Sequence, residues 1–105
     1  MYPTLAEVLD LPVLRAAAPR VRAGSGRLRA PVRWVHVSEQ RDPTGTLTGG
    51  ELVLSTGIAL ADPATDPQAY VARLHDAGAV GLVVELGEHV RVLPDGLVQA
   101  ARGVD

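Results

Sequence analysis

Hydrophobic and polar residues follow one another here in patterns that predict short helices and short strands. The chain opens with TLAE at residues 4–7, which fits a helix capping box, and apolar residues follow at helical spacing up to Leu9. Pro12 ends this helix or begins another short turn. The alternating residues 20–24 predict a short strand, and the glycines at 24 and 26 predict a turn after it.

Three later segments predict β-structure. Residues 32–38 (VRWVHVS) are rich in Val and contain the single Trp, which favours a half-buried strand. Alternation puts Trp34 and His36 on one face of it. A second strand begins at Glu51 and stops at residues 55–57 (STG), and the continuous apolar run at 80–84 is typical of a strand covered on both faces.

Two further helices complete the pattern. Asp66 is suited to cap a helix that begins at Pro67, and Gly78 is suited to end it. Another helix is predicted around residues 95–102. Strand, helix and strand therefore form a βαβ unit over about residues 51–85, with a right-handed crossover. The predicted fold class is α/β, with a small mixed sheet.

The length of 105 residues fits one domain, residues 1–105. In an α/β unit another strand is expected after the last helix, so we interpret the chain as part of a longer protein. There is no Cys and no Lys, since all ten basic residues are Arg. This composition excludes disulfides, thiolate zinc sites, cysteine nucleophiles, the Walker P-loop and Schiff-base chemistry. No apolar run is long enough for a membrane helix and no signal peptide is present, which predicts a cytoplasmic protein.

Charge is distributed unevenly along the chain. Residues 1–41 contain seven Arg and three acidic residues, a net +4, while residues 42–105 contain three Arg and nine acidic residues, a net −6. The five arginines between residues 20 and 33 either form a basic strip for an anionic ligand or are ordinary solvent-facing residues. The net charge of −2 gives no general reason to expect a polyanionic partner.

The candidate site lies where the predicted strands end, because ligands of open α/β sheets bind beyond the carboxyl ends of the strands. Hydroxyls, backbone amides near glycines and carboxylates would meet there. The alternative is that these loop residues only satisfy the strand ends. Ser38 and Glu39 join this rim if the strand at 32–38 runs parallel to the other two. The candidate ligand-binding residues are His36, Ser38, Glu39, Ser55, Thr56, Gly57, Glu85 and Gly87.

Catalysis has little support in the sequence. His36, His75 and His89 lie far apart and show no metal-ligand spacing, and Ser38 and Ser55 lack a nucleophile elbow. We therefore expect no enzyme, no metal and no cofactor. Three aromatic residues offer no stacking platform for single-stranded nucleic acid, so we expect no direct nucleic-acid binding and no membrane contact by this chain.

The motifs resemble the N-terminal domain of purine catabolism regulatory proteins. The strings that match are TLAEVLDLPVL (4–14), PVRWVHVSE (31–39), DP (42–43), GGELVLSTG (49–57) and AYVARLHDAGAVGLVVELG (69–87). The motif residues that are not ligand candidates are Trp34, Gly49, Gly50 and Glu51. At the level of fold, GGELVLSTG (49–57) and DAGAVGLVVELG (76–87) are also similar to the N-terminal domain of muramyl peptide ligases.

The resemblance implies a regulatory, effector-sensing domain of a bacterial transcription regulator. Two hypotheses follow. The domain binds a small metabolite at the strand ends, or it is a ligand-free module that forms a homodimer or docks on downstream domains of the same regulator. An exposed edge strand, expected in so short a sheet, motivates the second hypothesis.

Overall fold

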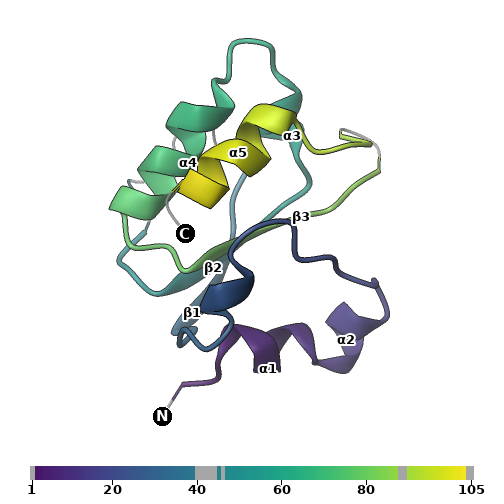
Figure 1. Cartoon of the computed structure of the whole chain (residues 1–105), viewed down its shortest axis with the longest axis vertical. Coiled ribbons are helices and arrows are strands. Elements are labelled where there is room, and N and C mark those ends of the chain that lie inside the picture. The colour runs from purple at the N-terminus through teal and green to yellow at the C-terminus, as the bar shows by residue number, and fades with distance from the viewer. Residues whose placement is uncertain (1, 40–44, 46, 88–89, 104–105) are drawn as a thin grey trace.

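The computed structural model describes residues 2–39, 45, 47–87 and 90–103, and shows a small sheet between two layers of helices (Figure 1). The strands are β1 (Trp34–Val37), β2 (Glu51–Ser55) and β3 (Gly81–Val84), in the order β1-β2-β3. Both pairings are parallel, with His36 opposite Val53 and Val53 opposite Leu82. The α/β class is therefore confirmed, whereas a mixed sheet is wrong for the three described strands.

The N-terminal layer consists of α1 (Leu5–Leu9), α2 (Pro12–Arg15) and a 3-10 turn at Ser25–Arg27. The capping box is confirmed, because the Glu7 amide donates to the Thr4 hydroxyl at 3.2 Å and the Thr4 amide donates to the Glu7 carboxylate at 3.1 Å. Pro12 is the first residue of α2. The amide of Leu5 donates to the carbonyl of Ala30, which fastens α1 beside the start of β1.

The opposite layer consists of α3 (Ile58–Ala61), α4 (Pro67–Asp76) and α5 (Asp95–Gly103). Asp66 caps α4 as predicted, since its carboxylate accepts from the Gln68 amide at 3.0 Å. Gly78, with φ +86°, follows the helix. The described β2–α4–β3 segment therefore has the predicted order of strand, helix and parallel strand.

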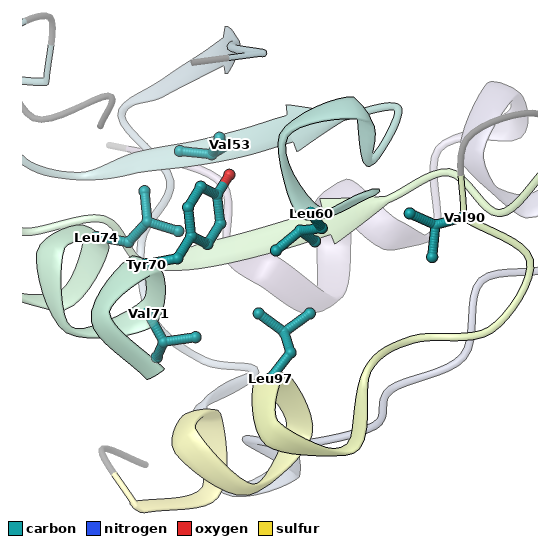
Figure 2. Close-up of a cluster of buried hydrophobic side chains, with 7 residues drawn as sticks. All are labelled: Val53, Leu60, Tyr70, Val71, Leu74, Val90 and Leu97. Carbon is teal, nitrogen blue, oxygen red and sulfur yellow. The ribbon is translucent and has the colours of Figure 1, made fainter. Parts of the chain in front are cut away.

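Each face of the sheet has its own hydrophobic cluster. The larger one lies under α4 and α5 (Figure 2) and consists of Val53, Leu60, Tyr70, Val71, Leu74, Val90 and Leu97. The smaller one lies under α1 and consists of Leu5, Val8, Val32 and Leu52. Successive β2 residues point to opposite faces, so Leu52 and Val53 join the two clusters through one strand.

Three predictions about elements need correction or fall outside the described residues. Residues 20–24 form no strand, because they line a hollow along the outer edge of β3 and pair with no described strand. β3 is only half-buried, since no described strand covers its outer edge. The sequence DPTG at residues 42–45 also predicts a turn, and these residues lie outside the described ones except for Gly45. Within the described ranges, no helix has the length and apolar character needed to span a membrane.

Candidate functional site

The carboxyl ends of β1 and β2 meet in a polar cluster formed by Glu39, Ser55 and Thr56. Because the two strands are parallel and adjacent, the residues that follow them leave the sheet side by side. The Glu39 carboxylate accepts hydrogen bonds from the Ser55 hydroxyl at 2.8 Å and from the Thr56 amide at 3.1 Å. It also accepts from the Thr56 hydroxyl. One carboxylate therefore binds three donors from the end of β2.

Gly57 fixes the shape of this strand end. Its φ of +83° is a conformation that side chains rarely adopt, and a Cβ there would lie 2.6 Å from a methyl group of Val90. Its amide donates to the Ser55 hydroxyl at 2.9 Å. Ser55 thus accepts from Gly57 and donates to Glu39, which fixes the direction of its hydroxyl.

The end of β3 joins the cluster only through the backbone. The Glu85 amide donates to the Ser55 carbonyl at 2.8 Å, and the Gly87 amide donates to the Val90 carbonyl at 2.8 Å. The Glu85 side chain is exposed. Ser38 is buried, and its amide donates to the Leu54 carbonyl at 3.0 Å. Glu88 and His89 lie outside the described residues.

The predicted residues therefore separate into groups. Glu39, Ser55, Thr56 and Gly57 form one hydrogen-bonded cluster, whereas Glu85 and Gly87 contribute backbone contacts beside it. His36 lies in the middle of β1, opposite Val53, and precedes the cluster along the strand.

Tyr70 is a polar group near this cluster that the sequence did not mark as functional. It is 1% exposed, and its hydroxyl points toward β2 beside Val53 (Figure 2). That hydroxyl has no hydrogen-bond partner among the described residues. Burial raises the pKa of the Tyr70 phenol, and the negative charge of Glu39 raises the pKa further. Helical spacing predicts that Tyr70 lies in the core. The one signal of a polar role in the sequence is the hydroxyl of Tyr at a position that an apolar residue such as Leu could fill.

The amino end of β2 has a second carboxylate, which has a structural role. Glu51 is 3% exposed and accepts from the amides of Thr48 at 2.6 Å and Gly49 at 2.7 Å. Burial by itself raises the pKa of this carboxyl, but the backbone hydrogen bonds from Thr48 and Gly49 outweigh burial, so the pKa lies below its ordinary value.

The two glycines before Glu51 explain the rest of this motif. Both have positive φ, +107° for Gly49 and +82° for Gly50. Gly50 accepts from the Arg33 amide at 2.8 Å and donates to the Gly78 carbonyl at 2.8 Å. The motif therefore joins the start of β1, the start of β2 and the end of α4.

A hollow lies apart from the strand-end cluster, along the outer edge of β3. This groove has a volume of about 330 Å³ and is mainly apolar. Leu5 and Leu28 line it from one layer, and Leu97 and Val98 line it from the other. Arg20, Arg22 and Arg27 also line the groove, so three of the five clustered arginines lie close together. Arg33 instead lies over the Tyr2 ring, 5.6 Å from its centroid.

Among the described residues, no group of three or more His, Asp or Glu side chains could hold a metal ion. The strand-end cluster offers a carboxylate, two hydroxyls and a backbone amide. These groups are suited to hydrogen-bonded recognition of a polar molecule.

Together these elements define a small parallel α/β fold with a polar cluster at the carboxyl ends of β1 and β2. The model of the purine catabolism regulatory protein-like family matches residues 7–105, and the chain belongs to that family. It is also similar to the transcriptional activator PmfR of Paenarthrobacter nicotinovorans, with 31% identity over 87 residues. The match covers 83% of this chain and 18% of that relative. No solved structure matches, and the likeness to muramyl ligase domains stays a prediction.

Proposed function

We propose that this chain is the effector-sensing domain of a longer, cytoplasmic transcription regulator. Its membership in a family of purine catabolism regulatory proteins supports the class of function. The match to the transcriptional activator covers only 18% of that relative, which supports the view that this chain is one part of a larger protein. In this proposal, other parts of that regulator bind DNA.

The effector site is proposed at the carboxyl ends of β1 and β2. The observation that supports it is the hydrogen bonding of Glu39 to Ser55 and Thr56, which places a carboxylate and two hydroxyls at one strand end. A polar metabolite can exchange hydrogen bonds with these groups. The Tyr70 hydroxyl, which has no hydrogen-bond partner among the described residues, is a further polar group close to Glu39.

The test is a thermal-shift screen of the 105-residue chain against purines, ureides, amino acids and nucleotides. A ligand at 100 times its Kd stabilises the folded state by about 2.7 kcal/mol, which corresponds to a Tm increase on the order of 10 °C for a domain of this size. Failure of every metabolite to raise the Tm of well-folded protein would contradict effector sensing by this domain.

Two matched variants locate the site. Thr56→Val removes a hydroxyl that donates to Glu39 at the carboxyl end of β2. Thr48→Val removes a hydroxyl that donates to Glu51 at the amino end. We expect the metabolite-induced shift to be lost in Thr56→Val and kept in Thr48→Val, each measured against the variant's own baseline. Equal shifts in both variants would place the effector elsewhere.

The second candidate function is self-association, or docking on another domain of the regulator, without a ligand. The exposed apolar side chains of β1 favour it. Sedimentation of the isolated chain distinguishes the two forms, because docking on a downstream domain leaves the isolated chain monomeric.

A further inference from the structure

Among the residues that the structure describes, no strand pairs with the outer edge of β1, which is apolar. Only β2 pairs with β1 among the described strands. Trp34, Val35 and Val37 are 58%, 56% and 68% exposed. Alternation puts Trp34 on one face of the sheet and both valines on the other, so apolar surface is open on both sides of this edge.

Natural proteins usually protect such an edge with charged residues, Pro or a bulge. Trp34–Val37 contains no Asp, Glu, Lys, Arg or Pro, and it pairs with β2 in a continuous register. The outer backbone groups of β1 are therefore suited to pairing with another strand.

We propose that β1 pairs antiparallel with β1 of a second copy of this chain, which joins two three-stranded sheets into one six-stranded sheet. The inference deepens the second candidate function by naming the surface and the partner. A two-fold axis perpendicular to the sheet generates this pairing, and two-fold dimers are the commonest assemblies of identical chains.

The sequence around β1 selects one register. A two-fold axis perpendicular to the sheet preserves the two faces, so a residue can lie opposite only a residue an even number of positions away. Centred on His36, the pairing sets Val35 opposite Val37 of the second copy and Arg33 opposite Glu39 of the second copy, twice by symmetry. Opposite charges then face each other at both ends of the paired segment.

The neighbouring registers lack this complementarity. Centred on Val35, the pairing sets Arg33 opposite Val37 of the second copy; centred on Val37, it sets Val35 opposite Glu39 of the second copy. Arg33 and Glu39 are exposed and already contact Tyr2 and the end of β2 in this structure. Exposed charge pairs contribute little free energy, so these two select the register more than they strengthen the dimer.

The other edge of the sheet, at β3, is not open to the same pairing. At β3 the α5 layer and the segment around Arg20–Arg27 wall the groove on both sides. Two β3 edges cannot come within hydrogen-bonding distance, because the walls of the two grooves would collide first. At β1 the flanking side chains on both faces are exposed, so two copies can approach in the plane of the sheet.

The first test is sedimentation of the 105-residue chain up to about 1 mM, without metabolite, because a four-residue strand buries less than a standard interface and forms a weak dimer. We expect concentration-dependent dimerisation that Val37→Lys weakens at least tenfold. Val92→Lys is the control, since Val92 is 76% exposed and lies outside β1. A monomer throughout the range, or equal weakening by both variants, would overturn the proposal.

The second test reads the register through cross-linking. The chain contains no Cys, so one introduced Cys is the only thiol. His36→Cys places two sulfurs opposite each other across the axis, at a separation that a disulfide can span. We expect His36→Cys to cross-link faster than Val35→Cys or Val37→Cys under mild oxidation, with circular dichroism showing that each variant folds. Faster cross-linking at residue 35 or 37 would overturn the register, and no cross-linking in any of the three would overturn the pairing.

Failure of this proposal and failure of effector sensing are distinguishable. Association is measured without metabolite, whereas sensing is measured by a Tm shift that does not depend on a second copy. A monomer whose Tm rises with a metabolite would contradict only the β1 pairing. A dimer that no metabolite stabilises would contradict only the sensing function.

Discussion

Glu51 shows how a buried carboxylate stabilises a turn in this fold. It is nearly inaccessible to solvent, yet its carboxylate accepts the amides of Thr48 and Gly49 and the hydroxyl of Thr48. These donors hold its pKa below the ordinary value in spite of burial. The charged form is therefore the one that the folded chain favours.

The pH dependence of stability follows from this shift. Because the folded-state pKa is depressed, the Glu51 contribution is complete above the unfolded-state pKa of about 4.3 and is lost as the pH falls through the folded-state pKa. We expect Glu51→Gln to cost about 2 kcal/mol of unfolding free energy at pH 7 and to flatten the loss of stability on acidification. Urea unfolding from pH 7 to pH 3 measures both effects.

The control is Glu85→Gln, which removes the same formal charge at an exposed side chain and should change the stability at pH 7 by less than about 0.5 kcal/mol. If the unfolding free energy of Glu51→Gln fell with decreasing pH as steeply as that of the parent chain, the buried carboxylate would not contribute to the pH dependence.

Local sequence was sufficient for some residues and insufficient for others. Thr4, Glu7 and Asp66 were predicted as caps because both partners of each bond lie within three residues. Tyr70 belongs to α4 and Glu39 follows β1, so the influence of one on the other required the three-dimensional fold. Glu39 could be placed at the rim only on the condition that β1 is parallel to β2, which the structure confirms.

At the scale of elements, the turn from β2 into α3 depends on Gly57. It combines a positive φ with a close approach to Val90, so an added Cβ meets both backbone strain and a steric clash. We expect Gly57→Ala to lower the unfolding free energy by about 2 kcal/mol, which chemical denaturation measures. The same turn orients Ser55 and Thr56 toward Glu39, so the variant should also weaken any metabolite-induced Tm shift.

Gly87→Ala is the matched control, because a Cβ at Gly87 would have no described residue within 4 Å apart from its chain neighbours. Its stability should stay within about 0.5 kcal/mol of the parent chain. If the two variants lost equal stability, the strain at Gly57 would not be the cause.

The errors at the scale of elements have a common physical origin. A strand exists only where a neighbouring strand completes its hydrogen bonds, and the alternating residues at 20–24 line the groove beside β3 without pairing with it. Similarly, the apolar run at 80–84 predicts burial on both faces, but the outer edge of β3 faces the groove. Periodicity reports what each segment can bury and does not report which surface covers it.

At the scale of the whole molecule, β2 joins two hydrophobic clusters of unequal size. Of the residues that the structure describes, seven buried ones lie in the cluster under α4 and α5, and four lie in the cluster under α1. Because local opening requires less free energy where fewer apolar contacts are broken, the α1 layer should open before the rest of the chain unfolds. The amides of β2 and α4 should then exchange with solvent only through global unfolding.

Two substitutions test this hierarchy by native-state hydrogen exchange. Val8→Ala should lower the opening free energy of the α1 amides by about 2 kcal/mol. The gap in opening free energy between α1 and α4 should therefore be larger than in the parent chain. Leu74→Ala, in the larger cluster, should lower the protection of α4 by about 2–5 kcal/mol and reduce that difference. Equal losses across α1, β2 and α4 in both variants would show that the two layers unfold as one cooperative unit, in which case the sheet transmits the loss of either cluster to the other.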